Sequence, residues 1–146
     1  MMKKLMIIFF IVFVGMINTP AQPAKLSIQN IEGQAGDTLR LSLMAENIHD
    51  VGAISLKISY DSDELEYVGL ENGAVDFLTN SKDSVITVGW FDMTAKNPIT
   101  LSDNKLLDLV FVKKDGEGKI SFIKEACEIS TSSGEPIAVN YADGSE

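Results

Sequence analysis

The sequence has few of the residues on which catalysis and covalent cross-linking depend. Its 146 residues include one cysteine, Cys127, and one histidine, His49. A single cysteine excludes a disulfide within the chain, and we expect Cys127 to be a buried small hydrophobe. His49 lies in the polar stretch 47–50. A surface histidine is expected there rather than a general base, because catalysis needs an oriented nucleophile and base together.

Other signatures of catalysis and metal binding are also missing from the sequence. There is no Gly-x-Ser-x-Gly elbow, no phosphate-binding glycine loop and no His-x-x-x-His pair. The acidic stretch Asp61–Glu64 begins like a calcium loop, but Leu65 and Glu66 stand where an EF-hand needs a ligand and a glycine. We expect these side chains to cap a turn instead, and a weak calcium site of another kind stays open. The sequence therefore predicts no enzyme, no cofactor and no metal site, and a hydrolase ranks last among the function classes.

The one long apolar run of the sequence lies at the N-terminus. Lys3 and Lys4 precede an apolar run at residues 5–17, and Thr-Pro-Ala at residues 19–21 offers small residues for signal peptidase. The run is short for a membrane span, which needs about 20 apolar residues. These features are typical of a signal peptide that is cleaved after Ala21. An uncleaved N-terminal anchor is the alternative.

Cleavage would define a signal peptide at residues 1–21 and one mature domain at residues 22–146. Without Lys3 and Lys4, the mature domain has 10 basic and 21 acidic residues and a net charge of −11. Such an acidic surface argues against nucleic acid or an anionic membrane as a partner. We expect a protein that is secreted, extracellular or periplasmic, and free of the membrane after cleavage.

Period-2 alternation of apolar residues is the main structural signal. In residues 52–60 (GAISLKISY) every second residue from Ile54 onward is large and apolar, which predicts a strand with one buried face. The same alternation at residues 38–45 predicts another strand, and the polar stretch 47–50 between the two predicts a turn.

Turn residues separate the remaining apolar segments. Further strands are predicted at residues 25–31, 65–68, 85–91, 106–112, 120–122, 128–131 and 137–141. Asp115–Gly118 (DGEG) predicts a tight hairpin turn, and the continuous apolar run at 106–112 predicts burial on both faces. Residues 74–80 stay open between a helical turn and an irregular crossing. Residues 92–104 predict a loop, within which a small hairpin around residues 99–101 stays open. About nine short strands without a 3.6-residue period indicate an all-β sandwich.

The order and spacing of four stretches of the chain form a further pattern. The stretches are Gly36–Leu41 (GDTLRL), Ile54–Asp61 followed by Leu65-Glu66, Leu106–Val112, and Gly118–Phe122. In this order and spacing they resemble a cohesin domain, the calcium-dockerin receptor module of cellulosomal scaffolds. The resemblance spans the chain from Lys25 to about Asp143.

The resemblance implies a nine-stranded β-sandwich with jelly-roll topology that recognises a protein and has no catalysis of its own. It also implies a dockerin-like partner that carries calcium and lies on one sheet face. The strands of that face correspond here to residues 52–60, 85–91 and 118–123. Family members often have Asn or Asp on the outward side of the first of these strands, whereas this chain has Ala53, Ser55 and Lys57.

Alternation within these strands predicts which residues line the partner-binding face. They are Ser55, Lys57, Ser59, Thr87, Gly89, Ser121 and Ile123. Two other function classes stay open. A carbohydrate-binding module, with a polysaccharide as its ligand, needs a row of exposed aromatic rings. Few rings are free for it, since alternation places Trp90 inward and only Phe91 outward. A structural or adhesion domain would associate with itself through an edge strand.

Overall fold

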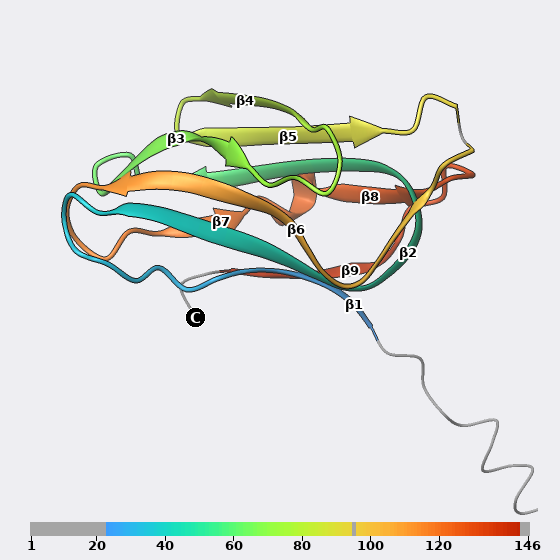
Figure 1. Cartoon of the computed structure of the whole chain (residues 1–146), viewed down its shortest axis with the longest axis horizontal. Coiled ribbons are helices and arrows are strands. Elements are labelled where there is room, and N and C mark those ends of the chain that lie inside the picture. The colour runs from blue at the N-terminus through green and yellow to red at the C-terminus, as the bar shows by residue number, and fades with distance from the viewer. Residues whose placement is uncertain (1–22, 95, 144–146) are drawn as a thin grey trace, which may run out of the picture.

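Nine β-strands and one short 3-10 helix form the part of the chain that the structure, a computed structural model, describes: residues 23–94 and 96–143 (Figure 1). The strands are β1 (Ala24–Ile28), β2 (Thr38–Tyr60), β3 (Leu65–Glu71), β4 (Leu78–Lys82), β5 (Val85–Phe91), β6 (Ile99–Lys113), β7 (Ile120–Phe122), β8 (Glu128–Thr131) and β9 (Val139–Ala142), and the helix is η1 (Lys124–Ala126). The predicted signal peptide, residues 1–21, lies outside the described residues. No helix in the described ranges has the length and hydropathy to cross a membrane.

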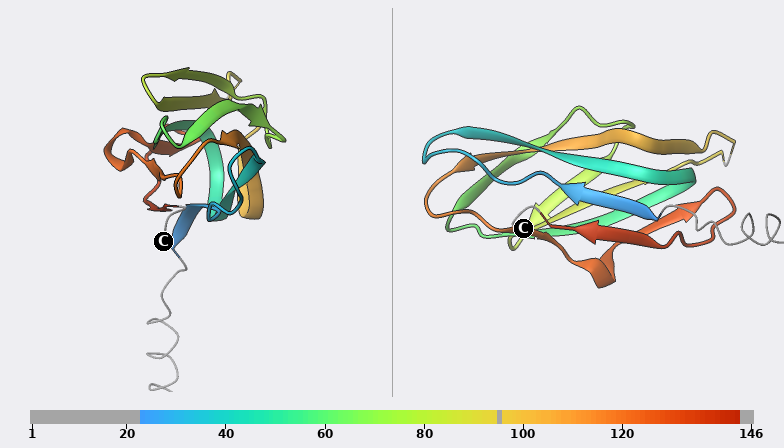
Figure 2. Two further views of the ribbon diagram at one scale, coloured as in Figure 1. Left: turned by 90° about the vertical axis from the view of Figure 1, so that its left-hand side faces the viewer. Right: turned by 90° about the horizontal axis from the view of Figure 1, so that it is seen from below.

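The two layers of the sandwich share one strand, the 23-residue β2. Its first half belongs to a sheet with strand order β3-β6-β2-β1-β9, in which β1 and β9 are parallel. Its second half pairs with β5, β7 and β8, and β4 pairs with β5 at the edge of this second sheet. Figure 1 shows β4 and β5 above β1 and β9, and Figure 2 shows the layers in two further views. The predicted nine-stranded β-sandwich with jelly-roll topology is confirmed.

β2 passes from one sheet to the other by bending at residues 47–50. Asn47 and Asp50 have positive φ angles there, 55° and 56°, a conformation that asparagine and aspartate adopt more readily than most residues. The pairing with β6 shifts register between Ile48 and Val51 but continues on both sides. The predicted turn at 47–50 is therefore wrong. The polar residues mark a bend within one strand, because neighbouring strands remain hydrogen-bonded across it.

The apolar sides of both halves of β2 face the core between the sheets. Leu39, Leu41, Leu43, Ile54, Leu56 and Ile58 are all buried. Residues 106–111 of β6 are buried without interruption, which confirms the predicted burial on both faces. Phe111 ends this run and contacts the rings of Tyr60 and Tyr67, with centroids 5.4 and 5.5 Å away. Burial of these side chains is the main favourable term for the fold.

Two predictions for the second half of the chain are wrong. The Asp115–Gly118 turn does not close a hairpin, because β6 lies in the first sheet while β7 pairs with β2 in the second. Gly116 and Gly118 have positive φ angles, 63° and 74°, so the sequence signals a turn correctly without showing which sheet follows it. The predicted loop at 92–104 is shorter, because β6 begins at Ile99 and pairs with the bend of β2.

The acidic stretch 61–64 forms a turn between β2 and β3, as predicted. The Oδ1 atom of Asp61 accepts a hydrogen bond from the backbone N–H of Asp63 at 2.9 Å. The Oε2 atom of Glu64 accepts one from the backbone N–H of Gly118, also at 2.9 Å. Asp61 thus caps its own turn, and Glu64 links this turn to the one at residues 115–118. Among the residues that the structure describes, no group of three or more His, Cys, Asp or Glu is arranged to hold a metal ion.

Asp108 is a buried carboxylate on the outer side of the first sheet, only 3% exposed. Its Oδ1 atom accepts a hydrogen bond from the Ser42 hydroxyl at 2.6 Å. Its Oδ2 atom accepts bonds from the Asn72 amide at 2.8 Å and the Lys105 ammonium at 3.2 Å. Burial alone raises the pKa of Asp108, but the three hydrogen bonds and the Lys105 charge outweigh it and hold the pKa below its usual value. The carboxylate thus links β2, β6 and the segment after β3.

Asp108→Asn is expected to lower the free energy of unfolding by about 2 kcal/mol at neutral pH, because hydrogen bonds to a buried charged group are lost. The folded pKa lies below the unfolded value of about 3.9. The carboxylate therefore stabilises the fold above that pH, and this stabilisation disappears as the pH falls through the folded pKa. Urea unfolding at a series of pH values should show the difference between wild type and variant shrinking as the pH falls. Asp103→Asn, at an exposed position of β6, is the control, and a pH-independent difference would contradict the assignment.

Gly52 allows a close backbone approach between β2 and the segment that follows β8. A Cβ atom at this position would lie 2.7 Å from the Cα atom of Ser132 and 2.8 Å from the carbonyl oxygen of Thr131. Because both are backbone atoms, Gly52→Ala should displace the end of β8 and lower the free energy of unfolding by about 1–3 kcal/mol, measured by urea unfolding. Gly69→Ala in β3 is the matched control, since its Cβ would meet no atom within 4 Å. Equal losses in the two variants would rule out the steric explanation.

Candidate partner-binding face

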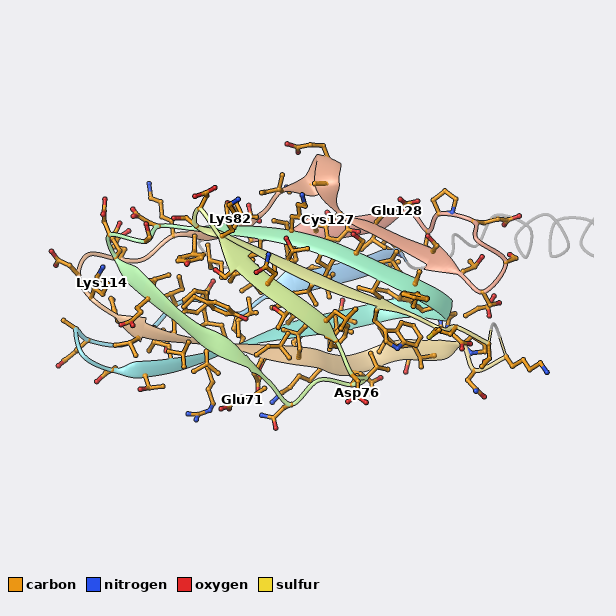
Figure 3. The ribbon with its side chains drawn as sticks, turned by 90° about the horizontal axis from the view of Figure 1, so that it is seen from above. Glu71, Asp76, Lys82, Lys114, Cys127 and Glu128 are labelled. Atoms are coloured by element: carbon orange, nitrogen blue, oxygen red, sulfur yellow. The ribbon has the colours of Figure 1, made fainter. Side chains whose placement is uncertain are left out.

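The outer surface of the second sheet is an ordered array of side chains, named here the β5 face. Successive residues of a strand point to opposite sides of a sheet, so the strand registers place each outward residue in a row that runs across the strands. The four rows are Phe91, Ala53 and Ser130; Leu78, Gly89, Ser55 and Glu128; Asn80, Thr87 and Lys57; and Lys82, Val85, Ser59 and Ser121. Figure 3 shows the molecule from the side of β4 and β5, with Lys82, Cys127 and Glu128 labelled.

The structure brings the seven predicted partner-binding residues together on the β5 face. They are Ser55, Lys57, Ser59, Thr87, Gly89, Ser121 and Ile123. Ile123 extends the third row, because its backbone N–H donates to the carbonyl oxygen of Lys57 at 2.8 Å. Ser59 and Ser121 join the fourth row through their hydroxyl oxygens, 3.1 Å apart. None of the seven is buried, and Ser55 and Lys57 are exposed.

Strand β4 adds residues to this face that the sequence did not reveal. Leu78, Asn80 and Lys82 lie across from Gly89, Thr87 and Val85, whereas the sequence leaves residues 74–80 open between a helical turn and an irregular crossing. All five residues of β4 are exposed. The strand extends past the edge of the core, so even its inward side buries no apolar residue and no alternation marks it. The only local sign that a strand ends here is the pair of turn residues that follows it, Asp83-Ser84.

Gly89 leaves a gap in the second row of the face. Leu78 across from it is 73% exposed, and Phe91, two residues along β5, is 58% exposed. Together with Ala53 and the carboxylate-bearing Glu128, they border a shallow depression of about 390 Å³. A Cβ atom on Gly89 would meet only the carbonyl oxygen of Ile54, at 3.9 Å. The backbone at this position could therefore accept a residue with a side chain. The absence of a side chain at Gly89 leaves the depression open.

The charges on the β5 face are separated along the strands. Glu128 lies in the second row beside the depression, and Lys57 and Lys82 lie in the third and fourth rows. Both lysines are exposed. Within residues 23–94 and 96–143, the ion pairs join Arg40 to Glu71 and Lys105 to Asp108 and include neither lysine. An otherwise acidic protein therefore presents two exposed lysines without an ion-pair partner at one end of this face.

Cys127 lies at the edge of the face, where it contacts the backbone of Lys57. Its Sγ atom lies 3.5 Å from both the backbone nitrogen and the carbonyl oxygen of Lys57. The side chain is half-buried rather than fully buried as predicted, because it follows η1 at the sheet edge. Burial raises the pKa of the Cys127 thiol; the backbone hydrogen bond with Lys57 lowers it by less, and the Glu125 carboxylate adds to the increase. The thiol stays protonated at neutral pH and is a poor nucleophile.

The aromatic residues of β5 lie as predicted. Trp90 packs against the core, and Phe91 is exposed at the strand end. The exposed large apolar residues of the described chain are Val68, Leu78, Phe91 and Met93, so Phe91 supplies the one aromatic ring among them. Carbohydrate modules stack sugars on several such rings. The arrangement does not favour a carbohydrate platform.

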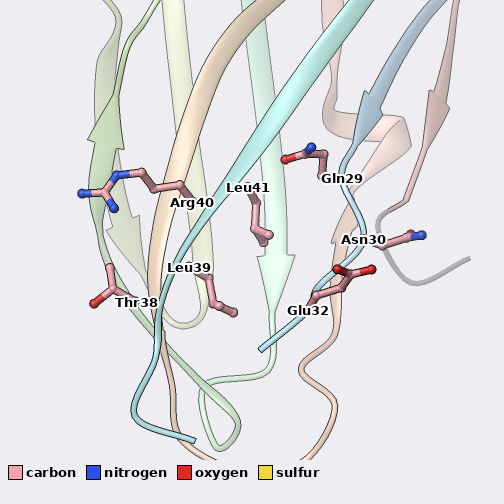
Figure 4. A pocket seen from close by; sticks show the side chains of 7 residues that line it. All are labelled: Gln29, Asn30, Glu32, Thr38, Leu39, Arg40 and Leu41. Carbon is pink, nitrogen blue, oxygen red and sulfur yellow. The ribbon is translucent and has the colours of Figure 1, made fainter. Parts of the chain in front are cut away.

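A second hollow, of about 560 Å³, lies on the first sheet (Figure 4). It opens where the chain after β1 separates from β2, with Gln29 and Glu32 on one side and Arg40 on the other. Gln29 uses its Oε1 atom to accept a hydrogen bond from the backbone N–H of Ser42 at 3.2 Å, and Arg40 pairs with Glu71 at 2.9 Å. These side chains already have partners within the domain. His49 lies elsewhere, exposed at the bend of β2 as predicted, so neither hollow contains a histidine.

Comparison with known proteins places this geometry among related domains. Cellulose-binding protein A of Clostridium cellulovorans is 30% identical over 95 residues, which cover 59% of this chain and 5% of that protein. The sixth cohesin of scaffoldin B from Acetivibrio cellulolyticus, solved in complex with a mutant Cel5 dockerin, has a TM-score of 0.75 at 20% identity, covering 84% of this chain and 96% of that one. A non-cellulosomal cohesin from the archaeon Archaeoglobus fulgidus has a TM-score of 0.71 at 20% identity, covering 84% and 88%.

At these identities the solved structures show a shared fold. The sequence itself shows more, since the profile of the Cohesin domain matches residues 24–145, nearly the whole described domain. The predicted resemblance is therefore confirmed. The chain belongs to the Cohesin domain family.

Proposed function

We propose that this domain binds a dockerin-like protein through the β5 face. Cohesin domains are non-catalytic protein-interaction modules, in agreement with the sequence-based expectation that the chain is not an enzyme. The observation that supports the proposed face most directly is the grouping of all seven predicted residues on one exposed sheet surface. The Acetivibrio cellulolyticus relative was solved with a dockerin bound, which supports a dockerin-like partner here.

The β5 face has the physical properties of a rigid docking surface. Its centre consists of short side chains, such as Ser55, Thr87 and Gly89, on strands that are hydrogen-bonded on both sides. Short side chains lose little conformational entropy on binding, and a preformed sheet needs no reorganisation. This chain has Lys57 at a position where family members often have Asn or Asp. The partner must therefore offer a surface that accepts a positive charge.

The proposal also includes export of the domain to the extracellular medium or the cell surface. The predicted signal peptide at residues 1–21 supports it, and the curated relative is a cellulose-binding protein of which this chain matches 5%. One similar structure is a non-cellulosomal cohesin, so the proposal does not require that this domain belong to a cellulosome. The resemblance implies that calcium is carried by the partner, so the domain itself needs no metal.

Self-association through β4 is the second candidate, because this strand pairs only with β5 in the described structure and is exposed along its length. The strand is short and polar and ends in Lys82, features that protect sheet edges from pairing. A monomer on a sizing column over a range of concentrations would exclude this candidate.

Substitution of the central row should abolish binding without unfolding the domain. Lys57→Glu combined with Thr87→Trp reverses a charge and places a large ring on the face, so affinity for the partner should fall by at least about a hundredfold. The circular dichroism spectrum and the unfolding midpoint should match the wild type. Lys25→Glu with Thr38→Trp makes the same changes on the first sheet and should bind normally. Unchanged affinity of the Lys57/Thr87 variant would refute the proposed face.

Capture by the purified mature domain tests the class of partner. Secreted proteins from the same source are passed over the immobilised domain with calcium or with a chelator. The proposal predicts retention of a protein with duplicated calcium loops and its release by the chelator. Retention of polysaccharide alone, or dimerisation of the domain without any captured protein, would contradict it.

A further inference from the structure

The depression at Gly89 and the two unpaired lysines occupy neighbouring rows of the β5 face, and together they define the chemistry of an occupant. We propose that the partner inserts an apolar side chain of an α-helix into this depression and binds Lys57 and Lys82 with acidic side chains on the same side of that helix. This inference rests on the proposed function and specifies the partner surface that the β5 face accepts.

The apolar contact is assigned from the exposure of Leu78 and Phe91. Both remain largely in water in the free domain, at 73% and 58% exposure, although they border one depression. A side chain that fills the gap over Gly89 would contact both and remove apolar surface from water on each side. Interfaces concentrate their binding energy in such central apolar anchors. Leu78 and Phe91 therefore act as the walls of an anchor site.

The spacing of the rows matches the repeat of an α-helix. Outward residues of a strand are about 6.6 Å apart, so Lys57 lies one such step and Lys82 two steps beyond the row of Gly89. Residues i, i+4 and i+8 of a helix lie on one side and are about 6 Å apart along its axis. A helix parallel to the strands, with an apolar residue at i and acidic residues at i+4 and at i+7 or i+8, reaches all three positions. Its diameter of about 10 Å covers two strand spacings, the width from β4 to β2.

Charge also sets the direction of this helix. Glu128 borders the depression, and the lysines lie at the other end of the face. The N-terminus of a helix carries partial positive charge and its C-terminus partial negative charge. The helix is therefore favoured with its N-terminus near Glu128 and its C-terminus toward Lys82. An apolar residue followed by acids at i+4 and at i+7 or i+8 is the sequence pattern that the face selects.

Filling the depression tests the anchor without disturbing the fold. In Gly89→Val the new Cβ meets only the Ile54 carbonyl oxygen at 3.9 Å, and valine suits a strand better than glycine. The probe is the purified dockerin domain obtained by capture, and affinity is measured by titration calorimetry. Affinity should fall about tenfold or more, while the unfolding midpoint stays the same or rises. Gly69→Val in β3, where a Cβ meets nothing within 4 Å, is the matched control and should bind like the wild type.

A second pair of variants removes one wall instead of filling the site. Phe91→Ser should also weaken binding about tenfold. Val68→Ser is its control, because Val68 is 59% exposed on the first sheet and Phe91 is 58% exposed on the second. The two side chains are exposed to nearly the same fraction, so each change replaces a half-exposed apolar residue with serine. A loss with Phe91→Ser alone locates the effect on the β5 face.

The charge contacts are tested by reversal and rescue. Lys82→Glu should weaken binding and reduce its dependence on salt. Replacing the acidic partner residue at i+7 or i+8 with lysine should restore affinity for Lys82→Glu and reduce it for the wild type. Lys25→Glu on β1 is the control for the change in net charge. Restoration specific to Lys82→Glu supports the proposed direction of the helix.

The outcomes separate this inference from the proposed function. If the dockerin binds and Lys57→Glu with Thr87→Trp abolishes binding, but Gly89→Val and Phe91→Ser bind like the wild type, the anchor is refuted and the face stands. If no dockerin binds the wild-type domain, both are refuted. Losses with Gly89→Val, Phe91→Ser and Lys82→Glu, and none with their controls, support the anchor and the acidic contacts.

Discussion

The fold depends on the continuity of β2 through the bend at residues 47–50. One 23-residue strand supplies the centre of both sheets, so its apolar residues face the core from two directions. The left-handed conformations of Asn47 and Asp50 turn the strand while its hydrogen bonds with β6 continue. As a result, the second half of β2 is held between β5 on one side and β7 and β8 on the other. That arrangement makes the β5 face rigid.

A rigid face of short side chains is well suited to recognition because little has to be ordered when a partner arrives. Its features are set by individual residues rather than by the fold. Gly89 leaves a depression that the backbone does not require, and Leu78 and Phe91 remain exposed beside it. Lys57 and Lys82 take part in none of the ion pairs of the described residues. The same sandwich with other residues at these positions would select another partner.

Sequence reasoning predicted the parts of the structure in which a buried face repeats every second residue. Strands β5 and β8 have the predicted bounds, and Trp90 and Phe91 point as alternation requires. It failed where local chemistry does not determine tertiary position. The polar stretch 47–50 bends a strand instead of ending it, and the glycine turn at 115–118 joins two sheets instead of a hairpin. Strand β4 has no buried side, so no alternation distinguishes it from a loop, and the turn residues Asp83-Ser84 alone do not show that a strand precedes them.

The central claim is that the partner binds the second sheet and not the first. Mapping of backbone amide chemical shifts in the labelled mature domain, during titration with a purified dockerin domain, tests it most directly. The account predicts that the shifts gather in β4, in β5, in residues 53–59 of β2 and in residues 121–123, while β1, β6 and β9 keep theirs. Shifts gathered on the first sheet, around the hollow between Gln29 and Arg40, would contradict the account.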